Sequence, residues 1–194
     1  MAYDITLEGK NKIIAERMLE SVAKILVNCD IQYWLEGGTL LGIRREGRLL
    51  PWDNDIDVSM MVNQSHKLNS FYGALKKSGF RVKTRTFNQN SSYFKQVDLR
   101  MIKIRERRFF GLIKGTVCLD VFIKYPNEDN SYWEIDNKTK FVPSKFYNAF
   151  KTISFKNHNY LIPELTDDYL TYRYGNWETP VKNWDTSKDD KALA

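Results

Sequence analysis

Three aspartates at alternate positions, Asp53, Asp55 and Asp57, are the residues in this chain most suited to chemistry. In an extended strand, alternate side chains point to the same face, so the three carboxylates share one face while Ile56 and Val58 fall on the other. Like charges at that separation repel each other, and packing does not favour such a row. A divalent cation would remove the repulsion, because Mg²⁺ prefers carboxylate oxygens and keeps positions for phosphate and water. A solvated turn with an acidic edge explains a bare Asp-x-Asp pattern equally well, so the neighbouring residues must decide.

A glycine pair precedes the aspartates, in the sequence Gly37-Gly38-Thr39 between the apolar runs 31–35 and 40–43. Glycines at the end of a strand let backbone N–H groups approach a phosphate closely. Alone, this tripeptide most often marks a turn. Together with the aspartates it predicts donors for phosphate oxygens next to carboxylates for a metal. The arginines between the two motifs are Arg44, Arg45 and Arg48.

The order of these motifs resembles the LicD and fukutin-related group of the nucleotidyltransferase superfamily. The matching segments are Gly-Gly-Thr-Leu-Leu-Gly-x-Arg at 37–44, and Pro-Trp-Asp-x-Asp-Ile-Asp at 51–57. The superfamily pattern adds a third carboxylate on a later strand, and Asp120 in the apolar run 118–123 is the candidate. The segment 174–177 resembles the family's closing motif, so the resemblance covers about residues 10–185.

The resemblance implies an α+β fold, with a nucleotidyltransferase-like mixed β-sheet flanked by helices. At 194 residues the chain is most simply one domain, 1–194, long enough to bury a core, and we expect the polar tail 186–194 to fray. A strand carrying Asp120 should then lie next to the strand carrying Asp57.

The resemblance also implies an activity, the transfer of a phosphorylated alcohol such as phosphocholine or phosphoribitol from a CDP-activated donor to a glycan hydroxyl. The expected partners are therefore a nucleotide-diphosphate-linked donor and a glycan acceptor. In this prediction Asp55, Asp57 and Asp120 are catalytic and hold Mg²⁺ or Mn²⁺, and Asp120 acts as a ligand or as the base for the acceptor hydroxyl. The residues expected to bind substrate are Gly37, Gly38 and Thr39 around the diphosphate, Arg44 and Arg48 on its oxygens, Asp53 in orientation, and Trp52, which packs the loop or stacks on a base.

Three other functions compete with this prediction. A true nucleotidyltransferase would use the same three carboxylates but attack an NTP and release pyrophosphate. A nucleic-acid binding module would explain the net charge of +6 and the 14% aromatic content, but no recognised binding motif appears and we expect no stable nucleic-acid partner. A non-catalytic family member that only binds glycans is the third.

Composition indicates an ordinary globular protein, with 42% hydrophobic and 28% charged residues. No apolar run reaches the length of a membrane span and the N-terminus lacks a signal-peptide layout, so we expect a cytoplasmic protein. A lipid-linked acceptor would be reached by peripheral contact at the inner membrane face, through the basic run 100–108. Cys29 and Cys118 are expected to be buried thiols, and His66 and His158 lack zinc-ligand spacing.

Periodicity and turn residues predict the elements that must position the site. We expect Asn63 to cap the helix that follows the aspartate strand, and Thr166 and Gly175 to cap the last helix at its two ends. The segment 125–159 is aromatic and punctuated by Asn, Asp and Pro, and it is predicted to be irregular. The predicted helices are 9–29, 40–47, 64–78 and 167–174, and the predicted strands are 31–35, 55–62, 80–85, 94–104 and 117–123.

Overall fold

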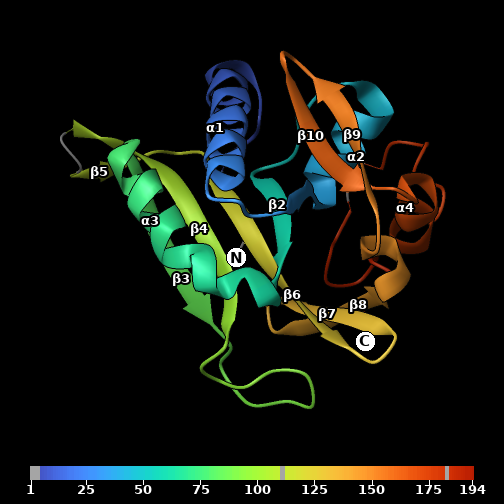
Figure 1. The fold of residues 1–194 in the computed structure, drawn as a ribbon. Helices are drawn as coiled ribbons and strands as arrows, with labels where there is room; N and C mark the ends of the chain where they lie inside the picture. The colour runs from blue at the N-terminus through green and yellow to red at the C-terminus, as the bar shows by residue number, and fades with distance from the viewer. Residues whose placement is uncertain (1–4, 110–111, 182–183) are drawn as a thin grey trace.

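A mixed β-sheet lies at the centre of the computed structural model, which describes residues 5–109, 112–181 and 184–194 (Figure 1). Its central strands follow the order β1-β2-β6-β4-β3, in which β2 and β6 run parallel and the other neighbours are antiparallel. The predicted mixed sheet flanked by helices is therefore confirmed. The strands of this path are β1 (Tyr33–Leu35), β2 (Ile56–Met61), β6 (Leu119–Asn127), β4 (Leu99–Arg108) and β3 (Phe80–Thr86), and β5 (Ile113–Lys114) pairs with the end of β4.

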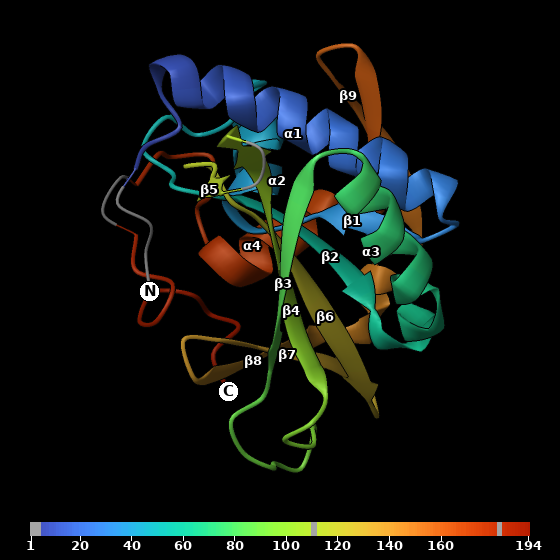
Figure 2. The same ribbon diagram turned by 90° about the vertical axis from the view of Figure 1, so that its left-hand side faces the viewer.

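Helices α1 (Gly9–Asn28) and α3 (Leu68–Lys77) contact each other and lie against one face of the sheet (Figures 1 and 2). Successive side chains of a strand point to opposite faces of the sheet. Ile102 and Ile104 of β4 and Val121 of β6 are fully buried on the face that the helices cover, and their neighbours along each strand point to the other face. The helix side of this layer is an apolar stripe at helical spacing. In α1 that stripe consists of Ala15, Met18, Leu19, Val22, Ala23 and Leu26.

The opposite face of the sheet carries the polar residues, and α2 (Gly37–Glu46) and α4 (Thr166–Tyr174) lie to the side of β2 in Figure 1. The first strand leads directly into α2, and β2 returns antiparallel to β1. As a result, the N-terminus of α2 and the start of β2 come together at one end of the sheet.

The segment predicted to be irregular, 125–159, is instead mostly β-structure. It forms the end of β6 and the strands β7 (Asn130–Ile135), β8 (Lys138–Pro143) and β9 (Phe150–Phe155), with a 3₁₀ turn, η3 (Ser144–Tyr147). The next strand, β10 (His158–Pro163), pairs with β9 in a separate hairpin. The turn between β7 and β8 consists of Asp136 and Asn137, both at positive φ (47° and 61°). Asp and Asn can adopt that conformation without glycine, so the expected Gly signal of a hairpin is missing from the sequence.

The two predicted N-caps are wrong. Asn63 lies inside a 3₁₀ helix, η1 (Val62–Lys67), and α3 begins only at Leu68 with no side-chain cap. Thr166 is the first residue of α4, and its hydroxyl donates to the Pro163 carbonyl. Gly175 does end α4, with φ +68°, as predicted.

The prediction that the C-terminal tail frays is wrong. The Phe141 N–H donates to the Ala192 carbonyl at 2.8 Å, Leu193 bridges to Lys140, and the Ala192 side chain is fully buried. The carboxylate of Asp190 lies within 2.6 Å of the Lys140 ammonium. A polar tail is held here because its charge meets buried charges from distant elements, which composition alone does not reveal.

Candidate active site

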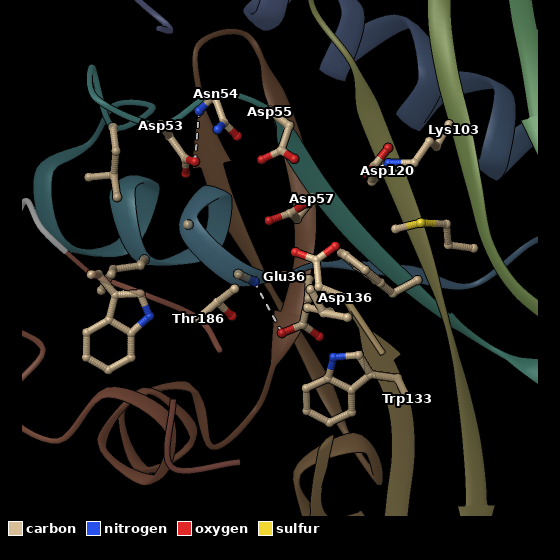
Figure 3. Close-up of a pocket in the computed structure, with 18 of the residues that line it drawn as sticks. Glu36, Asp53, Asn54, Asp55, Asp57, Lys103, Asp120, Trp133, Asp136 and Thr186 are labelled. Carbon is tan, nitrogen blue, oxygen red and sulfur yellow. Dashed lines mark hydrogen bonds and ion pairs between the residues drawn. The ribbon is translucent and has the colours of Figure 1, made fainter. Parts of the chain in front are cut away.

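The aspartates lie at the start of β2, at the end of the sheet where α2 begins. Asp57 is directly opposite Asp120 in the parallel register of β2 and β6, so both side chains share one face at the same level. Asp55 immediately precedes the strand. Figure 3 shows Asp53, Asp55 and Asp57 directed toward the same space, with Asp120 on the neighbouring strand. The predicted adjacency of Asp57 and Asp120 is therefore present.

The two glycines allow α2 to approach these carboxylates. Gly37 has φ +55°, and a methyl group built on it would overlap the Asp57 carboxylate. A methyl group on Gly38 would overlap the Asp53 carboxylate. The glycine pair therefore meets a requirement of the carboxylates themselves, and its contact with a diphosphate stays a prediction.

Thr39 joins α2 to β2. Its buried hydroxyl accepts a hydrogen bond from the Asp57 N–H at 2.9 Å, and the Glu36 N–H donates to the Asp57 carbonyl at 3.1 Å. The hydroxyl predicted to bind phosphate thus accepts a bond that fixes the backbone of Asp57, and its role as a donor to phosphate stays a prediction. Because both bonds act on the same residue, Asp57 is positioned from two sides.

The carboxylates of the cluster are costly to ionise. Burial raises the pKa of Asp53 to about 6. Burial, followed by repulsion from Asp53 and Asp120, raises the pKa of Asp55 well above its usual value. Burial also raises the pKa of Asp57, with Asp55 and Asp53 adding to it. A cation bound among these groups would stabilise their charged forms.

Asp120 is engaged on both oxygens. Its Oδ2 lies 2.6 Å from the Lys103 ammonium, and its Oδ1 accepts a hydrogen bond from the Cys118 thiol at 3.1 Å. Lys103 is the direct neighbour of Asp120 in the register of β4 and β6. The aspartate is therefore held in one orientation with only 2% of its surface exposed.

The donor set at this site suits a hard cation in part. Carboxylate oxygens of Asp55 and Asp57 are the ligands that Mg²⁺ prefers, and phosphate and water would fill its remaining positions. Across residues 5–109, 112–181 and 184–194, however, no group of three or more His, Cys, Asp or Glu side chains could hold a metal ion. The predicted three-carboxylate ligand set is therefore not assembled here, since Lys103 holds Asp120, and its metal role stays a prediction.

The arginines are arranged differently from the prediction. Arg44 donates two hydrogen bonds to Asp167, both at 2.9 Å, and Arg48 pairs with Glu46 at 2.7 Å. Neither side chain lines the cleft beside the aspartates. Arg45 does line it, with its nearly buried guanidinium donating to the Trp177 carbonyl at 2.9 Å. The placement disfavours the phosphate roles of Arg44 and Arg48, because their guanidinium groups already meet carboxylates outside the cleft.

The cleft has a volume of about 1520 Å³, which exceeds the usual range of roughly 300–1,000 Å³ for a single small ligand. Trp52 lines it and packs against the core, as predicted for loop packing. The closing motif contributes Tyr174, Asn176 and Trp177 to its wall. The opposite wall carries cations that the prediction did not assign to the site: Arg81, Lys83, Arg85, Arg100, Lys103 and Arg105.

Glu36 is the residue of this site that sequence reasoning missed most clearly. Its carboxylate, 2% exposed, lies 2.7 Å from Arg173 and 3.2 Å from Lys124, and it accepts hydrogen bonds from Ser59 and Tyr169. Burial alone would raise its pKa, but Lys124 and Arg173 outweigh burial and lower the pKa to about 2. Glu36 therefore ties the start of α2 to β2, β6 and α4. Its position directly before the glycine pair was the signal available.

Comparison with known proteins now adds to this geometry. Residues 30–164 match the family model described as the LicD/FKTN/FKRP nucleotidyltransferase domain. The chain belongs to the LicD family. This LicD-family chain is 28% identical over 179 residues to mouse ribitol-5-phosphate transferase FKTN, covering 88% of the chain and 34% of that protein. It is 38% identical over 53 residues to human ribitol 5-phosphate transferase FKRP, covering 27% of the chain and 11% of that protein.

Bacterial relatives also appear. An uncharacterized protein of Rickettsia typhi is 25% identical over 171 residues, covering 79% of this chain and 48% of that protein. Among solved structures, ANT(2″)-Ia in complex with adenylyl-2″-tobramycin is similar, with a TM-score of 0.47 and 15% identity over 88% of this chain and 81% of that one. The chain thus spans about a third of the length of the ribitol-5-phosphate transferase FKTN. No helix in the part of the chain that the structure describes is long and apolar enough to cross a membrane.

Proposed function

We propose that this LicD-family chain transfers a phosphorylated alcohol from a CDP-activated donor to a hydroxyl group of a glycan. The observation that carries the proposal is the register of β2 and β6, which sets Asp57 opposite Asp120 beside the N-terminus of α2. Family membership supports the transferase class, and the relatives named ribitol-5-phosphate transferases support a phospho-alcohol as the group transferred. The volume of the cleft is sufficient for a donor and an acceptor together.

In this proposal Asp55 and Asp57 hold Mg²⁺ or Mn²⁺. The ion, when bound, neutralises charge on the diphosphate and on the leaving CMP. Phosphoryl transfer otherwise asks the protein for in-line positioning and for donors to the non-bridging oxygens. The backbone N–H groups of Gly38 and Thr39, in the first turn of α2, are the proposed donors.

Asp120 is the proposed base. The acceptor hydroxyl oxygen attacks the phosphorus that bears the alcohol, the bond from that phosphorus to CMP breaks, and the hydroxyl proton passes to Asp120. The hydrogen bonds from Lys103 and Cys118 fix the orientation of its carboxylate for this transfer.

Ligand-dependent thermal stability tests the proposal. CDP-ribitol, CDP-choline, CDP-glycerol and the NTPs would each be added with and without Mg²⁺, because a true ligand stabilises the folded protein by mass action. We expect stabilisation that needs both a CDP-alcohol and the cation, followed by CMP release when an acceptor is present. Stabilisation by an NTP alone with release of pyrophosphate would instead identify a nucleotidyltransferase.

A further inference from the structure

The hairpin that joins β4 to β5 ends in exposed apolar side chains. Phe109, Leu112 and Ile113 are 70%, 84% and 51% exposed, and we call these three residues the hairpin tip. The Leu112 N–H donates to the Phe109 carbonyl at 3.1 Å, so these two residues lie side by side. Figure 1 shows β5 at the outer edge of the molecule. Apolar side chains grouped on a surface are unfavourable in water, and such patches mark interaction sites.

Cations lie directly behind the hairpin tip. In the antiparallel register of β4 and β5, Arg107 lies opposite Lys114 and Arg108 lies opposite Ile113. Arg107 and Lys114 are both exposed, and directly opposed like charges destabilise a strand pair unless an anion lies between them. Arg108 lies 3.7 Å from Glu106. Because neighbouring residues of a strand point to opposite faces, Arg107 and Arg108 place positive charge on both faces of the hairpin. We call Arg107, Arg108 and Lys114 the collar.

The base of the hairpin is held by hydrogen bonds. The Gly115 N–H donates to the Glu106 carbonyl at 2.8 Å. The guanidinium of Arg105 donates to the carbonyls of Gly115 and Thr116. The tip and the collar are therefore presented on a paired β-ribbon.

The hairpin also borders the cleft. Leu112, Ile113 and Lys114 line it, and so does Val181, which is 52% exposed. A side chain that lines a cleft and is also largely exposed lies at its opening. Apolar side chains from two distant segments therefore lie at this opening, and a surface that receives the hairpin tip would lie beside it.

The basic run 100–108, predicted to contact a membrane, is divided by the structure. Arg100 lies 2.6 Å from Glu134, and Lys103 pairs with Asp120, so these two cations meet carboxylates at the wall of the cleft. The end of the run, 107–108, is the part that adjoins the hairpin tip.

We infer that the hairpin tip and the collar dock this chain onto a bilayer that contains anionic lipids. The tip enters the boundary between headgroups and acyl chains, and the collar cations meet lipid phosphates. The dimensions agree with this assignment. The collar lies one or two residues behind the tip, about 3–7 Å along the strands, and interfacial elements enter the bilayer by about 5–10 Å. The inference goes beyond the proposed function and does not depend on it.

A protein or a nucleic acid fits this surface less well. Stable protein interfaces involve about 20–30 residues on each side, whereas the tip presents three apolar side chains on a narrow hairpin. Nucleic-acid surfaces combine cations with aromatic stacking platforms, which the aliphatic side chains of Leu112 and Ile113 do not provide. A bilayer needs only a few inserted apolar side chains with cations beside them.

Co-sedimentation of the full chain with vesicles, in the absence of any nucleotide, tests the inference. The vesicles contain phosphatidylcholine alone, or phosphatidylcholine mixed with phosphatidylglycerol. The tip variant is Phe109→Asn/Leu112→Gln, in which Asn suits the φ of +49° at residue 109. The collar variant is Arg107→Gln/Lys114→Gln.

Each variant has a control with matched changes on another surface. Ile13→Gln/Val27→Gln removes two apolar side chains of α1 that are 65% and 60% exposed. Lys76→Gln/Lys77→Gln removes two exposed charges from the end of α3. All four variants change exposed or half-buried side chains, so their circular dichroism should match that of the unaltered chain.

We expect the unaltered chain to bind the mixed vesicles and to bind phosphatidylcholine alone more weakly. The partition coefficient of the tip variant should fall about tenfold or more, because the burial of two apolar side chains is lost. That of the collar variant should fall about fivefold for each lost charge, and its dependence on salt should weaken. Both controls should stay within about twofold of the unaltered chain.

Leu112→Trp provides a change in the opposite direction. Trp favours the interface between headgroups and acyl chains, so this variant should bind the mixed vesicles more tightly than the unaltered chain. Loss of folding cannot produce such a gain. A decrease in binding by a folded Leu112→Trp would contradict insertion of the tip.

Other outcomes would also overturn the inference. Absence of vesicle binding by the unaltered chain, or equal losses in the tip variant and the α1 control, would exclude docking through the hairpin. Self-association without lipid that the tip variant abolishes, measured by analytical ultracentrifugation, would assign the tip to a second copy of this chain. Tighter binding of a thymidine oligonucleotide than of vesicles, lost in the collar variant, would assign the collar to nucleic acid.

The outcome of this test is separate from that of the proposed function. Vesicle binding is measured without donor or acceptor, so its failure leaves the proposed transfer reaction unaffected. Absence of stabilisation by CDP-alcohol and Mg²⁺ would contradict the proposed function and leave the docking surface unaffected.

Discussion

The aspartate cluster does not serve the stability of the fold. Asp53, Asp55 and Asp57 are gathered where burial and mutual repulsion oppose their ionisation. A solvated acidic turn, the alternative that the sequence left open, would show neither effect. The arrangement costs free energy in the absence of a cation and is favourable in its presence.

Replacing Asp57 with Asn should therefore stabilise the metal-free protein. Removing one charge of the cluster relieves a repulsion worth about 1 kcal/mol or more, which corresponds to a rise in Tm of about 2–4 °C for a chain of this size. The same variant should lose the stabilisation by Mg²⁺ and CDP-alcohol, and turnover with it. Thermal unfolding with EDTA and with Mg²⁺ measures both effects. The exposed substitution Asp129→Asn is the control, and a destabilised Asp57→Asn that still responds to Mg²⁺ would contradict the prediction.

The pH dependence of stability should show the same cluster. Asp53 has its pKa raised from 3.8 to about 6, so the folded chain binds more protons than the unfolded chain between these values. The free energy of unfolding contributed by this group therefore falls as the pH rises from about 4 to about 6, and stays low above that. We therefore expect Asp53 to add to the free energy of unfolding of the metal-free protein near pH 5 and to add little near pH 7.

The comparison that isolates this effect uses Asp53→Asn. Urea unfolding measures the free energy of unfolding near pH 5 and near pH 7. This free energy should fall less between the two pH values in the variant than in the unaltered chain. Saturating Mg²⁺ should also reduce the decrease, because the cation stabilises the ionised cluster. An identical decrease in all three samples would exclude a cluster with raised pKa values.

Among the helices and strands, α2 and β2 position the aspartates of the site where they meet. Thr39 and Glu36 hold the backbone of Asp57, and Gly37 and Gly38 let the helix approach its carboxylate. Arg44 on the later part of α2 pairs with Asp167 of α4, whereas Arg45 lines the cleft. The N-terminal turn of α2 is the part of the helix that lies against the aspartate carboxylates.

Alanine substitutions at Gly37 and Gly38 should separate the effect of backbone strain from the effect of crowding the aspartate carboxylates. Gly38→Ala is expected to keep the fold but displace the Asp53 carboxylate and weaken binding of donor and cation. Gly37→Ala adds a side chain at φ +55°, so it should also lose about 1–2 kcal/mol of unfolding free energy.

Gly73→Ala provides the control, because nothing lies within 4 Å of its added methyl group in the middle of α3. The free energy of unfolding of that variant should rise by about 0.5–1 kcal/mol, and its donor binding should be unchanged. Urea unfolding and ligand-dependent thermal shifts measure these effects, and unaltered donor binding by Gly38→Ala would contradict the role given to the glycine.

At the scale of the whole molecule, buried charges connect the sheet to the C-terminal tail. Arg173 bridges Glu36 and Asp190, and Asp190 also meets Lys140 of β8. All four of these side chains are buried. The network therefore links the site at α2 to α4, β8 and the last residues of the chain.

Asp190→Asn should destabilise the whole fold. It leaves the cations of Arg173 and Lys140 buried beside a neutral group, and loss of one partner of a buried ion pair costs about 3–5 kcal/mol. Urea unfolding measures the loss, with Asp129→Asn as the exposed control. A change below about 1 kcal/mol would mean that the tail does not contribute to the fold.

Elements and residues whose causes are local could be predicted from the amino-acid sequence. The stripe of α1 follows from the geometry of a single helix, and Gly175 ends α4 for a reason contained in its own φ. Of the three alternating aspartates, Asp57 alone lies within β2. The position of Asp120 next to Asp57 was predicted through the family resemblance, because the order of the motifs specifies the strands on which they lie.

The pairing of charges could not be predicted, because it depends on how distant segments pack. Lys103 on Asp120, Arg173 between Glu36 and Asp190, and the opposed cations of β3 and β4 join segments that are far apart in the chain. Strand register sets the pairs among β3, β4 and β6, and a shift of one residue would turn every side chain to the other face, so composition and spacing could not specify them. The contacts of Arg173 depend instead on how α4 and the C-terminal tail pack beside the start of α2. The hairpins of 125–159 escaped prediction for a related reason, since cross-strand pairing holds them and the β7–β8 turn uses Asp136 and Asn137 in place of glycine.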